Sequence, residues 1–166
     1  RCNEILKRLT LNPVEEDEFI DKDLTMRDYL SEIILSFKEI SKKKFIFNFD
    51  QFSNVKKITK SIEIVYGLRN FIGNANKFSK NSIYINLKSD SEFTEITIED
   101  DGNGYPKDVL SKIGEPYLRS NDPIDKSKTG LGLGLFIGKT LLEKNFASIN
   151  CRNSKTRAGA EVIIKW

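Results

Sequence analysis

The sequence predicts an α/β two-layer sandwich, in which helices cover one side of a mixed β-sheet. Apolar residues alternate as in β-strands in the segments "KFIFNFD", "SIYINLK" and "FTEITIED". Segments with helical spacing separate them, and two closing strands follow the last helix, in "ASINC" and "AEVIIKW". Strands that are separated by helices, with some hairpin-like neighbours, indicate one mixed sheet with its helices on one side. The chain shows no internal repeat.

The chain divides into three regions. Residues 1–12 have the apolar spacing of the end of a helix. Residues 13–24 are acidic and aperiodic, which predicts a solvated linker rather than a cluster of active carboxylates. Residues 25–166 hold all the expected strands, so we expect one main domain there.

The elements of this domain can be placed in order. Thr25 and Asp28 have the spacing of a capping box, ahead of an apolar stripe that runs from Met26 to Phe37. A longer helix is expected from about Ser61 to Ser79, and a short one after Pro106. The polar stretch 114–129 has no period of its own, and its length is typical of a lid or a binding loop.

Composition excludes several classes of function. The 166 residues carry 27 Lys and Arg against 24 Asp and Glu, and the lysines are spread along the chain, so no nucleic-acid partner is expected. No apolar run has the roughly 18 to 20 residues that span a bilayer, so this piece is not expected in the membrane. The chain has 0 His, which excludes Ser-His or Cys-His catalysis and His-ligated zinc within it.

Three polar residues line up on the longer helix. Asn70, Asn74 and Lys77 fall at i, i+4 and i+7, beside the apolar stripe. Amide oxygens suit Mg²⁺, and an ammonium group suits the phosphates that Mg²⁺ accompanies. A solvated helix face would give the same pattern, so this motif leaves both interpretations open.

A carboxylate ends the third predicted strand. Asp100 shares the phase of Ile96 and Ile98, so it should point inward, whereas Glu99 and Asp101 should point outward. The glycines of "DGNG", Gly102 and Gly104, allow a tight turn and a close approach of a flat ligand. An inward carboxylate beside exposed backbone suits a site that reads the amino group of a base. A simple Asp-Gly hairpin turn is the alternative.

A glycine run opens the last helix. Gly130, Gly132 and Gly134 alternate with leucines and lead into a helical segment, an arrangement that lets backbone N–H groups approach a phosphate. A Walker loop ending in "GKT" would need a glycine where Leu133 stands. A dinucleotide fingerprint would need glycine or alanine in place of Leu135, and it would need a strand directly before the run.

Together these motifs resemble the ATP-binding domain of sensor histidine kinases, within the wider GHKL class that includes gyrase, Hsp90 and MutL. "LRNFIGNANKFS" resembles the family's N box, "EDDGNGYP" its first glycine box, "GEPYL" its F box and "TGLGLGLFIGKTLLE" its second glycine box. The resemblance covers roughly residues 25–166 and implies the Bergerat-type ATP-binding fold. "RCNEIL", "IGEPYL" and "GLGLGLFIGKTLLEKNFA" resemble the RegB-type redox-responsive sensor kinases more closely.

The resemblance implies a role for each matching residue. Asp100 would accept the adenine amino group, with Gly102 and Gly104 as the floor of the site, and Phe78 would pack on the base. Asn74 would coordinate Mg²⁺, Asn70 would support the phosphate side, and Lys77 would contact phosphate. Residues from about 105 to 130 would form the ATP lid. The remaining ATP contacts implied in the lid and the glycine run are Arg119, Lys126, Lys128, Thr129, Gly130, Leu131, Gly132, Leu133 and Gly134.

The resemblance also implies the reaction and the partners. Hydrolysing members of the class have a glutamate where Asn70 stands, and an amide cannot act as a general base at neutral pH. The domain would therefore bind Mg²⁺-ATP and donate the γ-phosphoryl group to a histidine outside this piece, for relay to an aspartate of a response regulator. Residues 1–12 would end a dimerisation and phosphoacceptor hairpin. The whole would be a homodimeric bacterial inner-membrane sensor with this domain in the cytoplasm.

Two departures and two cysteines qualify this interpretation. Lys77 stands where RegB-type kinases often have an acidic residue, and Tyr105 is larger than the usual aliphatic residue. Cys2 would lie on the dimerisation helix, where it could sense oxidation through a disulfide or a sulfenic acid, or could simply pack between helices. Cys151 shares a strand phase with Ile149, which predicts an inert core residue.

Other functions fit parts of the same pattern. An anti-sigma-type serine kinase shares the ATP-binding fold, but it would usually have a glutamate at position 70. A GHKL ATPase would release phosphate well above background. A degenerate nucleotide-binding module would act only by pairing with another chain, and the presence of Asn74, Asp100 and the three glycines argues against it.

Overall fold

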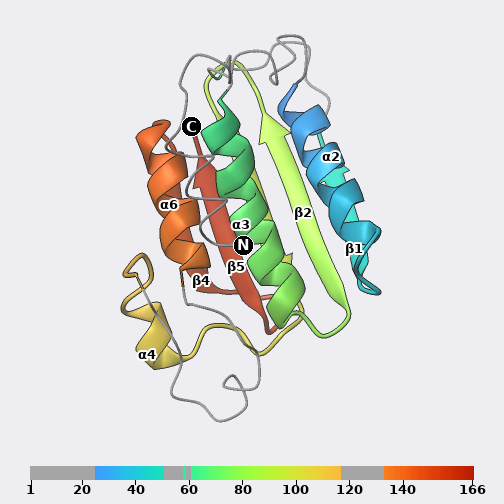
Figure 1. Ribbon diagram of the computed structural model, residues 1–166, viewed down its shortest axis with the longest axis vertical. Helices are drawn as coiled ribbons and strands as arrows, with labels where there is room; N and C mark the ends of the chain where they lie inside the picture. Colours follow the sequence, from blue (N-terminus) through green and yellow to red (C-terminus); the bar gives the residue numbers. More distant parts are fainter. Residues whose placement is uncertain (1–24, 51–57, 59–60, 117–132) are drawn as a thin grey trace.

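A computed structural model describes residues 25–50, 58, 61–116 and 133–166, and the predicted hairpin end and linker lie outside this part. Five strands form one mixed sheet in the order β1-β2-β3-β5-β4 (Figure 1). β1 pairs with β2 in parallel, and the other neighbours are antiparallel. The strands are β1 (Lys44–Phe49), β2 (Ser82–Ser89), β3 (Thr94–Asp100), β4 (Ser148–Asn153) and β5 (Ala160–Lys165).

Helices cover one face of this sheet, which confirms the predicted two-layer sandwich (Figure 1). The longer helices pack side by side on it, and a short helix lies near one end of the sheet. The helices are α2 (Met26–Lys38), α3 (Ile62–Phe78), α4 (Lys107–Leu110) and α6 (Gly134–Lys144). The predicted capping box of α2 is present, since Thr25 and Asp28 exchange hydrogen bonds. Ser61 caps α3 through the N–H of Glu63.

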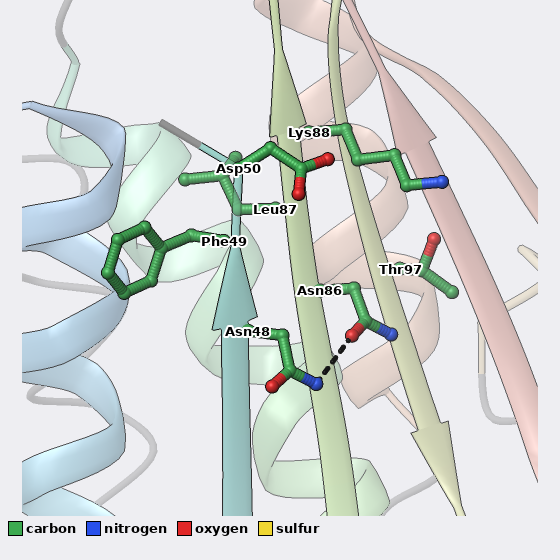
Figure 2. A pocket seen from close by; sticks show the side chains of 7 residues that line it. All are labelled: Asn48, Phe49, Asp50, Asn86, Leu87, Lys88 and Thr97. Atoms are coloured by element: carbon green, nitrogen blue, oxygen red, sulfur yellow. Dashed lines mark hydrogen bonds between the residues drawn. The ribbon is translucent and has the colours of Figure 1, made fainter. Parts of the chain in front are cut away.

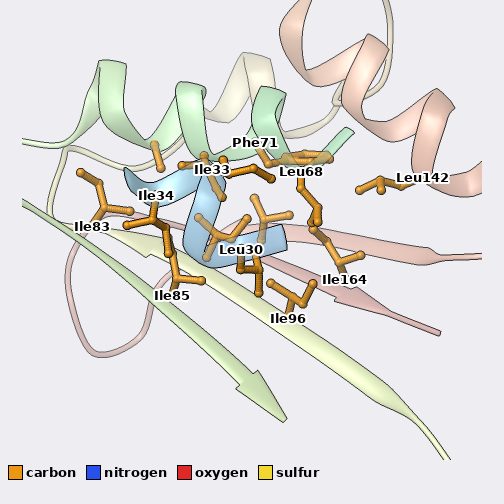
Figure 3. Close-up of a cluster of buried hydrophobic side chains, with 14 of the residues drawn as sticks. Leu30, Ile33, Ile34, Leu68, Phe71, Ile83, Ile85, Ile96, Leu142 and Ile164 are labelled. Atoms are coloured by element: carbon orange, nitrogen blue, oxygen red, sulfur yellow. The ribbon is translucent and has the colours of Figure 1, made fainter. Parts of the chain in front are cut away.

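The core fills the layer between the helices and the sheet (Figure 3). Alternate residues of β2 and β3 face it, as the period of two in their sequences predicts. The apolar stripes of α2 and α3 close it from the other side. Its most buried members are Leu30, Leu68, Phe71, Ile72, Ile83, Ile85, Ile96, Ile98, Leu142 and Ile164.

Two glycines bring α3 and α6 close together. A Cβ atom on Gly67 would lie 2.6 Å from Cγ of Leu142, and one on Gly138 would lie 2.9 Å from Cε2 of Phe71. Real Cβ atoms do not approach other heavy atoms so closely, so larger residues would push the two helices apart. This packing fixes where the N-terminus of α6 lies along α3. Gly138 therefore has a packing role inside a helix, where glycine otherwise costs stability.

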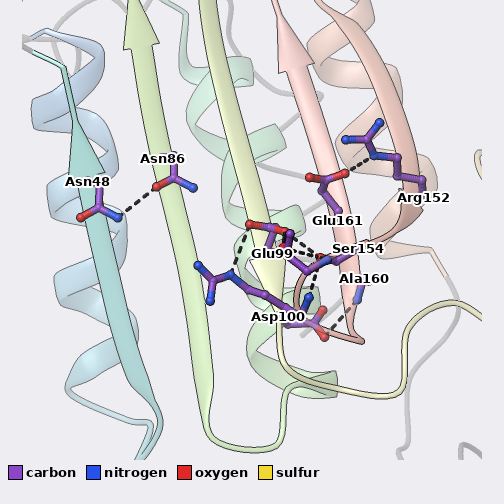
Figure 4. A network of polar contacts seen from close by, with 10 residues as sticks. Asn48, Asn86, Glu99, Asp100, Arg152, Ser154, Ala160 and Glu161 are labelled. Atoms are coloured by element: carbon purple, nitrogen blue, oxygen red, sulfur yellow. Dashed lines mark hydrogen bonds and ion pairs between the residues drawn. The ribbon is translucent and has the colours of Figure 1, made fainter.

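The other face of the sheet carries mostly polar residues, such as Asn48, Asn86 and Thr97, and a loop covers part of it. Glu99, which the sequence predicts to point outward, does lie on this face, but its exposed fraction is only 7%. The β4–β5 loop covers it, because Oγ of Ser154 and Nε of Arg157 donate to its carboxylate at 2.8 and 3.4 Å (Figure 4). The predicted outward direction of Glu99 is therefore confirmed. Its burial was not predicted, because strand phase gives the face of the sheet but not the segment that packs on that face.

A shallow hollow of about 260 Å³ lies at the far end of the sheet (Figure 2). Asn48 and Asn86 pair across it through their side-chain amides at 3.0 Å. Its lining includes Leu87, which pairs with Ile96, whereas Asp100 lies at the opposite end of β3. The hollow is thus separate from the predicted site. In the described part of the chain, no helix combines the length and the apolar character needed to cross a bilayer.

Candidate functional site

Asp100 ends β3 on the helix-covered face, as its strand phase predicts. Only 3% of the residue is exposed. The N–H group of Gly102 donates to its Oδ1 at 2.8 Å. The N–H group of Ala160 donates to the same oxygen at 3.2 Å (Figure 4). Burial nevertheless raises the pKa of this carboxyl above its ordinary value, against the effect of these two hydrogen bonds. A buried carboxylate whose two bonds both end on Oδ1 offers Oδ2 to a donor from outside the chain.

Two glycines enclose this carboxylate at van der Waals distance. A Cβ atom on Gly159 would lie 1.9 Å from the carbonyl oxygen of Asp100 and 2.5 Å from its Oδ1. A Cβ atom on Gly102 would lie 2.4 Å from the carbonyl oxygen of Phe78. The backbone of three segments, the end of α3, the turn after β3 and the start of β5, therefore meets around Asp100. Such a cradle leaves no space for side chains between the carboxylate and the backbone around it.

The turn after Asp100 is held by a side chain from β4. Gly104 has a φ of 76°, a conformation that residues with side chains rarely adopt. The side chain of Asn153 bonds to both backbone groups of Tyr105: its Oδ1 accepts the N–H at 2.6 Å and its Nδ2 donates to the carbonyl at 3.1 Å. Tyr105 itself is buried in the core, although it lies at the start of the range predicted for the lid. Asn153 thus fixes the turn that forms the predicted floor of the site.

The three polar residues of α3 lie half-buried along the helix, between its core face and solvent. Nδ2 of Asn70 donates to the carbonyl of Tyr66 at 2.8 Å, which orients its Oδ1 away from that turn. Nζ of Lys77 lies 5.1 Å from the centre of the Phe78 ring. Asn74 lies between them in sequence, one turn from each. The helix therefore connects Asn70 at one end of the site to Phe78 near Asp100 at the other.

The N-terminus of α6 lies beside Asn70. A Cβ atom on Gly134 would lie 3.8 Å from Oδ1 of Asn70. Leu133 occupies the N-cap position without a capping side chain, and the first turn holds no acidic residue. Uncapped N–H groups and the positive end of the helix dipole favour an anion at this position. The end of the site at Asn70 and Gly134 is therefore suited to phosphate, and the end at Asp100 to a polar, flat group.

A divalent cation would depend on few protein ligands here. Among the described residues, no group of three His, Cys, Asp or Glu side chains is arranged to hold a metal ion. The amide of Asn74 fits a magnesium ion that keeps phosphate and water ligands, which is how Mg²⁺ is usually bound with nucleotides. The donor set is thus consistent with a metal that arrives with its nucleotide rather than with a resident metal.

The structure brings together one part of the predicted site. Asp100, Gly102 and Phe78 meet at one end, and Asn70 and Gly134 meet at the other. The structure also describes Gly104, Asn74, Lys77 and Leu133, whose positions are given above. The role of every predicted residue stays a prediction. The other predicted residues lie outside the described part of the chain. These residues are Cys2, Arg119, Lys126, Lys128, Thr129, Gly130, Leu131 and Gly132.

Sequence reasoning missed three residues that shape the site. Gly159 lies between the two predicted closing strands, where a glycine is common, so the sequence does not single it out. Its contact with Asp100 depends on the β3–β5 pairing. No pattern in the sequence predicts that the side chain of Asn153, at the end of β4, bonds to the backbone of Tyr105. Lys43 was one of three consecutive lysines, yet its ammonium group bonds to the end of α3.

Comparison with known protein families gives a match over most of the domain. The family described as histidine kinase-, DNA gyrase B-, and HSP90-like ATPase matches residues 59–166. Sensor histidine kinase RegB of Cereibacter sphaeroides is 34% identical over 119 residues, which cover 63% of this chain and 26% of RegB. Sensor histidine kinase CpxA of Escherichia coli is 29% identical over 87 residues, which cover 52% of this chain and 19% of CpxA. The chain thus spans about a quarter of RegB and less of CpxA.

Solved structures share the fold. The mycobacterial sensor histidine kinase MprB superposes with a TM-score of 0.69 at 19% identity, covering 86% of this chain and 93% of the MprB chain. The catalytic domain of histidine kinase ThkA gives 0.68 at 21% identity, covering 84% and 91%. Full-length ShkA in complex with AMPPNP gives 0.67 at 20% identity, covering 86% and 30%. At these identities the likeness establishes the architecture alone.

Proposed function

Because the chain belongs to the family of histidine kinase-, DNA gyrase B- and HSP90-like ATPases, we propose that it is the ATP-binding catalytic domain of a sensor histidine kinase. It binds Mg²⁺-ATP and transfers the γ-phosphoryl group to a histidine outside this chain. The observation that carries the proposal is the buried Asp100 at one end of α3, with Asn70 and the start of α6 at the other.

The adenine end is built for one hydrogen-bond donor. Oδ2 of Asp100 accepts the exocyclic amino group of adenine, while Oδ1 stays bonded to the backbone. The close backbone contacts of Gly102 and Gly159 keep the carboxylate in place, and Phe78 packs on the base. Because the site is buried, a base without this amino group would leave the carboxylate without a partner, which costs affinity.

The phosphate end is built from backbone and amides. The first turn of α6 directs N–H groups at the phosphates, and the glycine run before it extends this cradle. Lys77 and the lid residues Arg119 and Lys128 add positive charge. A bound Mg²⁺ ion would neutralise the phosphate charge, and Asn74 is the side chain that would hold it. Asn70 orients the phosphate group beside Gly134.

The reaction is phosphoryl transfer rather than hydrolysis. A ring nitrogen of the acceptor histidine attacks the γ-phosphorus, a P–N bond forms, and the bond from phosphorus to the β–γ bridging oxygen breaks, so that ADP leaves. Asn70 cannot remove a proton from water, so hydrolysis is slow and the phosphoryl group is kept for the acceptor. The domain contributes mainly alignment and charge stabilisation.

The relatives support a proposal for the rest of the protein. RegB and CpxA bear the names of sensor histidine kinases, and this chain spans only a part of their lengths. We propose that residues 1–12 end the dimerisation and phosphoacceptor hairpin of a homodimer. The phosphoryl group then passes from the histidine to an aspartate of a response regulator. The domain is placed on the cytoplasmic side of a bacterial inner-membrane sensor, with Cys2 as its candidate redox residue.

Calorimetric titration of the purified chain with Mg²⁺-ADP and Mg²⁺-ATP tests the nucleotide site. Wild type and Asp50→Asn, whose carboxylate lies at the far hollow, should bind alike. Asp100→Asn should lose about 100-fold or more in affinity, because it cannot accept the amino group with a charge. Phosphate release should stay near background. Fast release independent of an added acceptor would identify an ATPase instead.

A second measurement tests the transfer itself. The chain is incubated with ATP labelled at the γ-phosphate, alone and with the separately purified hairpin of its own full-length protein. The proposal predicts no label on this chain, which has 0 His, and acid-labile label on the hairpin. Label on serine or threonine of any partner would instead support a serine kinase.

A further inference from the structure

Lys43 immediately precedes β1 and reaches the C-terminal end of α3. Its Nζ donates to the carbonyl oxygen of Ser79 at 2.6 Å and also to that of Asn76. The neighbouring turn makes a second connection to the helix, since Oγ of Ser41 donates to Oδ1 of Asn76 at 2.7 Å. The N–H of Lys43 in turn donates to Oγ of Ser41 at 3.2 Å. The segment before β1 is thus joined to the end of α3 by three side-chain bonds.

These bonds hold the last turn of α3, which belongs to the predicted site. The last turn of α3 carries Lys77 and Phe78, and the carbonyl of Phe78 lies against Gly102. Carbonyl groups at a helix C-terminus have no partners within the helix and carry partial negative charge, so a lysine ammonium is well suited to bind them. Lys43 is half-buried and strengthens these bonds by its charge.

We propose that Lys43 is a positioning residue of the nucleotide site, which holds the end of α3 against the Asp100 turn and supplies positive charge to the surroundings of Asp100. This inference rests on the proposed nucleotide-binding function. Lys43 does not touch the reacting phosphate in this account. It acts through Phe78 and through the ionisation of Asp100.

The charges around Asp100 give this role a measurable signature. Lys43 lowers the pKa of Asp100, whereas burial and the neighbouring Asp101 raise it. Tyr105 also faces this region, but its own pKa lies well above the ordinary value because it is buried, so its hydroxyl stays neutral. Cys151 beside it has a pKa raised to about 11 and is also neutral at physiological pH. Loss of the Lys43 charge therefore leaves Asp100 easier to protonate.

The test measures Mg²⁺-ADP affinity as a function of pH for wild type and three variants. Lys43→Gln keeps donors for carbonyls but removes the charge, and Lys43→Arg keeps the charge. Lys42→Gln is the matched control, because Lys42 is the exposed neighbour. Protonation of ADP itself is the same in every titration, so differences between variants belong to the protein. A thermal melt of each variant checks that it is folded.

We expect Lys43→Gln to bind Mg²⁺-ADP about tenfold more weakly at neutral pH. The pH at which its affinity falls to half should move upward, because Asp100 binds a proton at higher pH without the lysine. Lys43→Arg and Lys42→Gln should keep the wild-type pH profile.

Two results would overturn the inference. Lys43→Gln could bind like Lys42→Gln at every pH, or both Lys43 variants could be weaker with an unchanged pH profile, which would indicate a structural role only. Absence of binding by the wild type would remove the nucleotide site itself, and that result is distinguishable from both.

Discussion

Glu99 and Asp100 are adjacent carboxylates on opposite faces of β3, and both are buried, at 7% and 3% exposed. Glu99 is bound by the guanidinium of Arg157 and the hydroxyl of Ser154. Asp100 takes part in none of the ion pairs found among the described residues, and its hydrogen bonds come from backbone N–H groups.

From this difference in partners we infer a structural role for Glu99 and a ligand-binding role for Asp100. A buried carboxylate that is paired with a cation of the same chain makes the fold depend on that cation, because removal of the cation leaves an uncompensated buried charge. A buried carboxylate without one costs the fold free energy and is available to a ligand. The face that carries Glu99 is therefore expected to govern stability, and the face that carries Asp100 to govern binding. The predictions that follow test this separation.

Gly159 lies in the β4–β5 loop, which covers Glu99, and it also contacts Asp100. Its substitution should therefore have the largest effect. In Gly159→Ala the new methyl group collides with the backbone of Asp100, which cannot move without breaking the β3–β5 pairing. We expect the free energy of unfolding to fall by about 3 kcal/mol. Urea denaturation at neutral pH measures it.

Ala158→Gly is the control for that substitution. Ala158 has a φ of 59°, a conformation that favours glycine, so this change in the same loop should keep or raise stability. Equal losses in Gly159→Ala and Ala158→Gly would show that the loop, and not the contact with Asp100, sets the effect.

Substitution of Arg157 tests only the face of the sheet that carries Glu99. Its Cζ lies 3.5 Å from the centre of the Tyr84 ring, and its Nε pairs with Glu99. Arg157→Met keeps the apolar stem but leaves Glu99 buried without its cation. The pair is partly exposed, so we expect a loss of about 1–2 kcal/mol in the free energy of unfolding. Mg²⁺-ADP affinity should change by less than about threefold.

Lys155→Met is the matched control in the same loop, because Lys155 is exposed. It should be close to wild type in both measurements. A loss of nucleotide affinity in Arg157→Met that matched its loss of stability would show that the two faces do not act separately.

Asp101 directly follows β3, and its carboxylate binds the backbone of the turn between α3 and β2. It is a second structural carboxylate. Burial would raise its pKa, but N–H groups of Asn81, Ser82 and Lys80 donate to it and hold the pKa below the ordinary 3.8. Its stabilising contribution is present above pH 3.8 and is lost as the pH falls through the lower value of the folded state. Asp101→Asn should therefore cost about 1 kcal/mol at pH 7.

The pH dependence of that loss is the check. The difference between wild type and Asp101→Asn in urea denaturation should shrink as the pH falls below about 4. A difference that stayed constant with pH would assign the effect to shape rather than to charge.

Asp100→Asn should have the opposite sign and the smallest effect on the free chain. The raised pKa of Asp100 means that its contribution to stability is present in full below pH 3.8 and is lost as the pH rises through the folded-state value. Asn can still accept both backbone N–H groups without a buried charge. The melting temperature at neutral pH should rise by a few degrees, and the gain should vanish in acid. A lower melting temperature of Asp100→Asn at neutral pH would contradict the interpretation that the buried charge of Asp100 destabilises the free chain.

The sequence allowed much of this site to be predicted, because the relevant signals are local. The inward direction of Asp100 follows from its phase with Ile96 and Ile98, and the ends of α3 follow from Ser61 and Ser79. Both depend on residues a few positions apart.

The rest depends on contacts between distant segments. Glu99 is buried because a loop more than fifty residues later folds over it, as the bond to Ser154 shows. Gly159 matters through the pairing of β5 with β3, and Gly138 through the packing of α6 on α3. Periodicity reports which face a residue occupies, but not which segment covers that face.

The central claim is that Asp100 recognises the amino group of adenine. Inosine diphosphate has a carbonyl group in place of that amine and the same phosphates, so calorimetric titration with Mg²⁺-ADP and Mg²⁺-IDP isolates the contact. Wild type should prefer Mg²⁺-ADP by about tenfold or more. Asp100→Asn should lose or reverse this preference, because its amide NH2 takes the place of Oδ2 and can donate to the carbonyl of inosine but not accept from the amine of adenine. Equal affinity of the wild type for the two nucleotides would contradict the claim.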